Sequence, residues 1–202
     1  MRSAILALFA LTLAAAASSA QSVDPRQAPT GRYQLEQNHS LVLFAISHLD
    51  LTDYYGRFDK LSGTLNFDAA EPEKSAVSIT IETASINTPS TKLTGELASA
   101  VVFDAGQFPA ATFKSTSIQR TGPTTGKITG DLTIKNVTKP VTLDVVFGGG
   151  RQNPMGNSYA LGFHATAAIK RSDFGLTSMP WDSFVGDEVK LTIEAMFLHQ
   201  KE

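Results

Sequence analysis

The chain has 202 residues, a formal net charge of −2 at pH 7 and no cysteine. A weakly acidic chain lacks the basic surface that nucleic-acid binding needs, so we expect no nucleic-acid partner. The absence of cysteine excludes disulfides, thiol chemistry and lipid attachment at an N-terminal cysteine, so stability must come from apolar burial.

The first twenty residues have the pattern of a secretory signal peptide. Arg2 gives a positive start, residues 4–17 form a mostly apolar run, and Ser18, Ser19 and Ala20 supply small residues before a cleavage point. The run is shorter than the roughly 20 residues of a transmembrane helix, and no second candidate follows it. We therefore expect cleavage after residue 20, a periplasmic product and no integral membrane segment in that product.

Residues 21–30 contain Pro25 and Pro29 and few apolar side chains, which predicts a flexible leader. Residues 31–202 are long enough to enclose one core without disulfides or metals, so we expect a single domain there.

Beyond the leader, apolar and polar residues alternate with the period of strands that have one buried face. The predicted strands are 33–36, 40–48, 56–67, 77–82, 112–118, 128–134, 141–147, 160–169 and 191–197. One helix is predicted over residues 92–101, with Ser90 or Thr91 as its cap and Leu93, Leu97 and Val101 on one stripe. Strands so regularly spaced predict an all-β sandwich or barrel, with the helix across one mouth.

Two of the predicted strands depart from simple alternation. Every residue from 41 to 46 is apolar. In residues 160–168 one face holds Leu161, Phe163, Ala165 and Ala167, and the other holds Ala160, Gly162, His164, Thr166 and Ala168. A small barrel fills its interior with large side chains, whereas a ligand-binding barrel leaves space with small ones. Alternation alone leaves both a filled core and a ligand cavity open.

Catalytic and metal-binding patterns are missing from the sequence. The histidines at 39, 48, 164 and 199 have no metal-ligand spacing, and no nucleophile motif or phosphate loop occurs. We therefore expect no enzyme, no metal and no cofactor. Arg171 and Asp173 are spaced to form an ion pair at a barrel corner or to bind a polar head group. Trp181 and Phe184 could line an entrance or anchor a loop in the core.

Several segments, in order from Tyr33 to the C-terminus, resemble the YceI-like family of bacterial secreted polyisoprenoid-binding proteins. The matching stretches are Asn38-His39-Ser40 with Phe44, Ile46 and His48-Leu49; Gly56-Arg57-Phe58 with Gly63, Leu65 and Phe67-Asp68; Phe103-Asp104 with Phe108-Pro109 and Thr112-Phe113-Lys114-Ser115; Gly130-Asp131-Leu132-Thr133-Ile134 with Val137-Thr138-Lys139-Pro140-Val141; and Lys170-Arg171-Ser172-Asp173-Phe174-Gly175. The resemblance implies an extended, lipocalin-like antiparallel β-barrel of about eight strands, a long apolar pore and an isoprenoid or other long-chain lipid as partner.

The chain departs from that family on the helix. Where the family usually carries a basic-acidic pair followed by His-Leu, this chain has Gly95, which weakens the helix, and Glu96 in the place of the histidine. The departure concerns recognition of a head group and not the wall around a lipid tail.

Alternation and the resemblance together assign a lipid-binding wall. Its predicted members are Val42, Phe44, Ile46, Phe67, Val77, Ile79, Ile81, Phe113, Ile128, Leu132, Ile134, Leu143, Val145, Phe163, Ala165 and Ala167. The predicted mouth or head-group residues are His48, Arg171, Asp173 and Trp181. Two alternatives stay open: a barrel enzyme with His48, Asp173 or Glu96 as acid or base, and a filled structural or interaction barrel. Homodimer formation is also left open.

Overall fold

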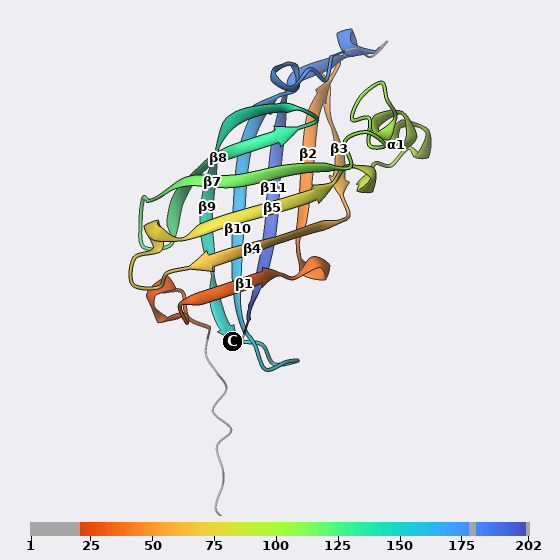
Figure 1. Cartoon of the computed structure of the whole chain (residues 1–202). Coiled ribbons are helices and arrows are strands. Elements are labelled where there is room, and N and C mark those ends of the chain that lie inside the picture. Colours follow the sequence, from red (N-terminus) through yellow and green to blue (C-terminus); the bar gives the residue numbers. More distant parts are fainter. Residues whose placement is uncertain (1–20, 178–180, 201–202) are drawn as a thin grey trace, which may run out of the picture.

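The computed structural model describes residues 21–177 and 181–200, in which eleven strands form one antiparallel sheet and one α-helix lies beside it (Figure 1). The strands and the helix are β1 (Gly31–Leu35), β2 (Leu41–His48), β3 (Thr52–Phe58), β4 (Leu61–Phe67), β5 (Ala76–Glu82), β6 (Ile86–Asn87), α1 (Thr91–Ala98), β7 (Ala110–Arg120), β8 (Thr125–Ile134), β9 (Val137–Gln152), β10 (Tyr159–Lys170) and β11 (Val185–His199). The short 3₁₀ helices are η1 (Pro25–Gln27), η2 (Gln37–His39), η3 (Pro72–Lys74), η4 (Thr83–Ser85), η5 (Arg171–Phe174) and η6 (Asp182–Phe184).

Eight of the strands close into a barrel. They follow the order β1-β4-β5-β7-β8-β9-β10-β11, and β11 pairs with β1 to complete the ring. Closure leaves no unpaired edge among these eight strands. The predicted all-β antiparallel barrel with one short helix near a mouth is therefore confirmed.

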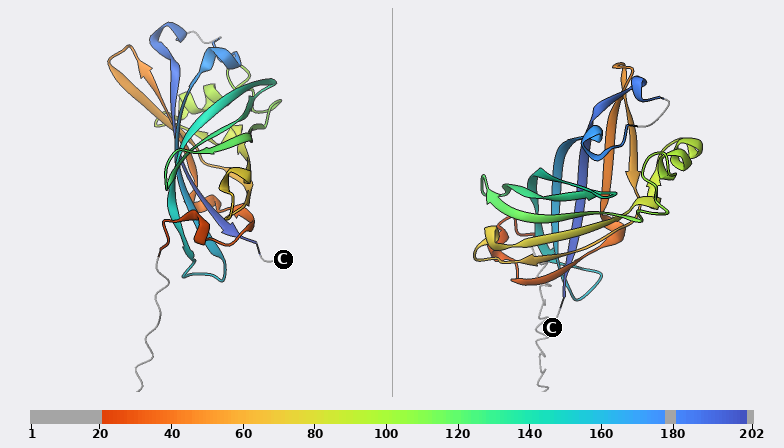
Figure 2. Two further views of the ribbon diagram at one scale, coloured as in Figure 1. Left: turned by 90° about the vertical axis from the view of Figure 1, so that its left-hand side faces the viewer. Right: turned by 45° about the horizontal axis from the view of Figure 1, so that its top comes forward.

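The barrel is extended at one end because β11 has two different partners. Residues 197–199 of β11 pair with β1, whereas residues 185–194 pair with β2. Strands β2, β3 and β6 then continue the sheet outside the ring, and the β2–β3 hairpin projects past the end of the barrel near α1 (Figure 2). One end of the barrel is consequently wider than the other.

The predicted strand over residues 56–67 is wrong, because the structure divides it into β3 and β4. Between them, Asp59 N donates to Ser85 O at 3.0 Å and Lys60 N donates to Ser85 Oγ at 3.0 Å. The Gln37 side chain donates to Asp59 O at 2.7 Å and accepts from Leu61 N at 2.8 Å. These partners satisfy backbone groups at the corner, which apolar alternation does not reveal.

Residues 21–30 pack against the barrel, unlike the flexible leader expected from their composition. Ser22 pairs with Gly150 of β9, and Ala28 is buried in the core. The hydroxyl of the fully buried Tyr33 donates to Pro29 O at 2.6 Å, and burial raises the pKa of this phenol. The predicted signal peptide, residues 1–20, lies outside the described residues.

The end of the barrel around β1 is filled by aromatic side chains. Tyr33 and Phe67 meet edge to face at 6.1 Å, and Phe163 lies 5.4 Å from Phe147 and 6.0 Å from Phe197, measured between ring centroids. Such offset and edge-to-face contacts are the preferred arrangements of buried rings. The filled-core reading therefore describes this half of the barrel.

Candidate functional site

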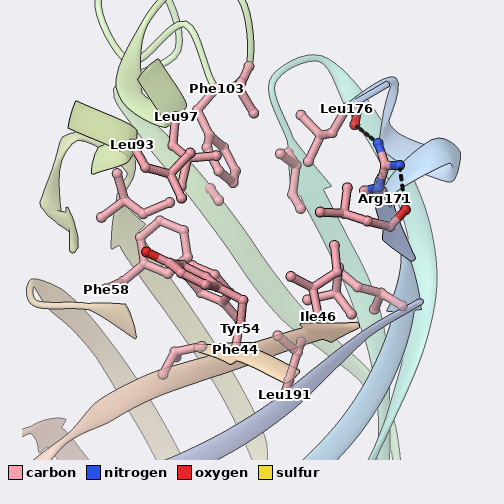
Figure 3. Close-up of a pocket in the computed structure, with 18 of the residues that line it drawn as sticks. Phe44, Ile46, Tyr54, Phe58, Leu93, Leu97, Phe103, Arg171, Leu176 and Leu191 are labelled. Atoms are coloured by element: carbon pink, nitrogen blue, oxygen red, sulfur yellow. Dashed lines mark hydrogen bonds between the residues drawn. The ribbon is translucent and has the colours of Figure 1, made fainter. Parts of the chain in front are cut away.

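A cavity of about 370 Å³ occupies the wider end of the barrel, between the β2–β3 hairpin, α1 and the loops after β10 (Figure 3). Nearly all of the lining side chains are apolar. The lining residues are Val42, Phe44, Ile46, His48, Tyr54, Phe58, Ile81, Ile86, Leu93, Glu96, Leu97, Val102, Phe103, Ala111, Leu132, Ile134, Ile169, Arg171, Leu176, Trp181, Phe184, Val185, Val189 and Leu191. Both open readings of the barrel thus apply, each to a different half.

Helix α1 forms one wall of the cavity. The Ser90 hydroxyl accepts from Leu93 N at 3.3 Å and caps the first turn, as one of the two predicted caps. Leu93 and Leu97 lie one turn apart and point into the cavity (Figure 3). The helix ends at Ala98, and Val101 is 52% exposed, so the predicted extension of the stripe to Val101 is wrong.

The chain after α1 turns back toward the barrel and adds a second layer of apolar side chains. Phe103 N donates to Leu97 O at 3.0 Å, which holds Phe103 beside the helix. The Phe103 ring meets Phe58 edge to face at 5.7 Å, and Phe58 lies 6.0 Å from Phe44. These three rings link β2, β3 and the segment after α1 around one side of the cavity.

A glycine sets the position of the Phe44 ring. Phe44 of β2 pairs with Gly56 of β3, and a Cβ atom at residue 56 would lie 2.2 Å from the ring Cζ. Because no side chain can share that space, the ring of Phe44 packs directly over the β3 backbone. Gly56 thereby determines where the aromatic wall stands.

Arg171 closes the loop side of the cavity with a buried guanidinium. Its Nε donates to Gly186 O at 2.9 Å, Nη1 donates to Leu176 O at 2.9 Å and to Asp182 Oδ1 at 2.6 Å, and Nη2 donates to Asp182 O at 3.2 Å and Val185 O at 3.3 Å. The predicted ion pair at a barrel corner exists, but its acid is Asp182 instead of Asp173. Asp173 is exposed and does not line the cavity.

The predicted wall residues divide into three groups. The cavity lining includes Val42, Phe44, Ile46, Ile81, Leu132 and Ile134, and three of the predicted mouth residues, His48, Arg171 and Trp181. Eight wall residues do not line the cavity: Phe67 and Phe113 are buried in the core, and Val77, Ile79, Ile128, Leu143, Phe163 and Ala167 are partly buried and pack against it. Val145 and Ala165 border a separate polar hollow that also includes His164 and Glu194.

Several lining residues were absent from the predicted wall. Leu93 and Leu97 had a visible signal in the helical stripe, although the sequence could not place the helix against the cavity. Phe103 and Leu176 follow turns and belong to no periodic pattern. Ala111 carries no signal of its own, because a small residue on a strand fits a core as well as a cavity.

Across residues 21–177 and 181–200, no cluster of three or more His, Asp or Glu side chains has the geometry to hold a metal ion. No helix in this part of the chain combines the length and apolar content needed to cross a bilayer.

The chain matches a protein family and several known proteins. The YceI-like domain model matches residues 33–197. A UPF0312 protein of Ectopseudomonas mendocina (strain ymp) is 38% identical over 172 residues, covering 84% of this chain and 90% of the relative. A UPF0312 protein of Pseudomonas putida (strain W619) is 36% identical over 167 residues, covering 82% of this chain and 86% of that protein.

Solved structures share the same barrel. Burkholderia cenocepacia BcnA superposes with a TM-score of 0.71 at 29% identity, covering 80% of this chain and 98% of that one. The Campylobacter jejuni YCEI protein gives a TM-score of 0.68 at 31% identity, covering 77% and 91%. A Saccharophagus degradans domain described as polyisoprenoid binding gives 0.60 at 16% identity, covering 83% and 98%, which indicates a shared fold. On the matches of sequence and of structure, this chain belongs to the YceI-like family.

Proposed function

We propose that the protein is a periplasmic carrier that holds the apolar chain of an isoprenoid or similar amphiphilic lipid in the cavity. The observation that carries this proposal is an almost wholly apolar cavity of about 370 Å³ that stops at a filled aromatic core. The structural relative described as a polyisoprenoid-binding domain has the same fold, which is consistent with such a ligand.

The volume of the cavity limits the length of chain that fits. An apolar cavity of about 150 Å³ holds benzene, so 370 Å³ has room for about fifteen carbons, or roughly three isoprene units. At about 0.8 kcal/mol per methylene, their burial contributes nominally about 12 kcal/mol. Association costs at least about 4 kcal/mol, which leaves about 8 kcal/mol, or micromolar affinity.

We propose that the protein binds the lipid without converting it to a product. The side chains with polar atoms in the described lining are those of His48, Tyr54, Glu96, Arg171 and Trp181, which include no serine, threonine, cysteine or lysine nucleophile. The guanidinium of Arg171 is already occupied by the surrounding loop. A carrier needs only a shaped apolar volume, and this arrangement supplies one.

An apolar rim beside the mouth supports loading from a membrane. Leu49 and Leu51, in the β2–β3 turn, are 50% and 79% exposed, and Phe184, 51% exposed, also lines the cavity. Leu49 N donates to Phe184 O at 2.8 Å, which joins the turn to the cavity wall. Leu49 and Asp50 both have positive φ, which is a costly backbone conformation for leucine. The predicted signal peptide supports a periplasmic location.

A series of isoprenoid alcohols tests the proposal. Delipidated protein is titrated calorimetrically with geraniol, farnesol and geranylgeraniol, which differ by one isoprene unit each. We expect a large gain in affinity from geraniol to farnesol and little further gain, because about fifteen carbons fill the cavity. Affinity that keeps rising with chain length would show that the aromatic core opens to admit more chain. Failure of all three alcohols to bind would refute the carrier function.

A further inference from the structure

The cation in the cavity wall has no hydrogen-bond donor left for a ligand. A guanidinium carries five N–H groups, and in Arg171 each of them has an acceptor within the protein. Four of these contacts go to backbone carbonyls and one goes to the carboxylate of Asp182. The side chain is 9% exposed and is held by the loop around it, so it cannot turn toward a phosphate without breaking that set.

The remaining polar lining cannot replace Arg171 as an anion site. His48, Tyr54 and Trp181 are the other potential donors among the described lining residues, and none of them carries a permanent positive charge. Lys92 is outside the lining, 87% exposed, with its Nζ 3.9 Å from Glu96 Oε1. A lipid phosphate at this mouth would therefore lack the fixed cation that phosphate sites use.

Glu96 makes the mouth of the cavity unfavourable for an anionic head group. It projects from α1 between Leu93 and Leu97 in sequence, lines the cavity and is 44% exposed, so its carboxyl lies where an apolar chain would meet water. An ionised carboxylate only accepts hydrogen bonds, and it repels a neighbouring anion. Alcohol or amine groups can donate to it, and an amine adds charge attraction.

We infer that the ligand carries a hydrogen-bond-donating head group without negative charge, such as an alcohol or an amine, and that prenyl phosphates and diphosphates are rejected. This inference rests on the proposed function and specifies the class of ligand for the same cavity. The apolar wall supplies affinity for the chain, and Glu96 together with the internally saturated Arg171 selects the head group.

Three ligands with one chain and different head groups test the inference. Farnesol, farnesylamine and farnesyl diphosphate are titrated into the full-length delipidated protein by calorimetry. We expect farnesylamine to bind at least as tightly as farnesol, and farnesyl diphosphate to bind at least about 100-fold more weakly, as for a desolvated anion without partners.

A charge reversal at the mouth provides the matched comparison. Glu96→Lys is expected to reduce the ratio of the affinities for farnesol and farnesyl diphosphate by about tenfold or more, since the lysine can pair with the diphosphate. Glu73→Lys makes the same change of charge on the exposed 3₁₀ helix before β5, away from the cavity, and should leave the affinity ratio of the two ligands unchanged.

The outcomes separate this inference from the proposed function. Farnesyl diphosphate binding within threefold of farnesol would overturn the head-group inference and leave the carrier function standing. An equal response to Glu96→Lys and Glu73→Lys would also overturn it, because selection would then not come from Glu96. If none of the three ligands binds, the carrier function fails and the inference fails with it.

Discussion

Replacing Ala111 with tryptophan should abolish binding of a fifteen-carbon chain while the barrel stays folded. Ala111, in β7, is 5% exposed and its small side chain borders the cavity. An indole at this position enters empty space next to Leu132 and Ile134, which also line the cavity, so the perturbation adds bulk without adding a charge.

The magnitude follows from the volumes. If about 150 Å³ accommodates six ring atoms, the nine ring atoms of indole take about 220 Å³ of the 370 Å³ cavity and leave room for about six carbons. The bound chain then loses about nine carbons, nominally about 7 kcal/mol of burial at 0.8 kcal/mol each. Even a third of this loss would weaken binding about fiftyfold.

The assay is calorimetric titration with farnesol, accompanied by thermal melts followed by circular dichroism. Overpacking of a filled core costs about 1–3 kcal/mol, and the cost should be smaller here because the ring enters a cavity. Thr112→Trp is the control, since Thr112 points to the opposite face of β7, where it pairs with Thr80 and Thr133. A folded Ala111→Trp variant that binds farnesol like the parent would refute the assignment of the cavity as the binding site.

Three further outcomes follow from other contacts. Arg171→Leu removes five hydrogen bonds from the buried guanidinium, including its ion pair with Asp182, so stability should fall by about 3 kcal/mol and Tm by about 6–12 °C. An unchanged melt would contradict the structural role of Arg171. Hydrogen bonds from the Ser172 side chain and backbone lower the pKa of Asp187 below its ordinary value of 3.8. The ionised Asp187 therefore contributes to folding stability above pH 3.8, and this contribution is lost as pH falls through the lowered pKa. Ser172→Ala should raise the Asp187 pKa measured by NMR, and an unmoved titration would argue against the side-chain contact. Leu51→Asp should slow farnesol uptake from phosphatidylcholine vesicles without changing its equilibrium affinity, and an unchanged rate would exclude the rim from loading.

The barrel was predictable because most of its strands alternate apolar and polar residues. Residues 141–147, for example, place Val141 and Phe147 inside and Thr142 and Asp144 outside, as β9 does in the structure. The helix cap was predictable to within two residues, Ser90 or Thr91, since a hydroxyl before a helix satisfies a free backbone N–H, and the structure uses Ser90. Such signals are local, and a local signal is enough to give the class of fold.

The cavity was harder to predict because alternation gives the face of a residue and not its depth in the barrel. Phe67 and Phe44 both point inward, yet one packs in the aromatic core and the other lines the cavity. The partner of Arg171 lies eleven residues away, at Asp182, and is chosen by loop geometry that has no period. Contacts of this kind depend on tertiary placement, so sequence spacing favoured Asp173.

The measurement that tests the carrier function most directly is native mass spectrometry of the protein purified from its host without detergent or organic solvent. We predict one bound molecule per chain, released by solvent extraction and identified as an amphiphile whose apolar chain fills the cavity and whose head group is not anionic. A bare polypeptide mass, together with no uptake of farnesol by the same sample, would contradict the proposal that this cavity exists to hold a lipid.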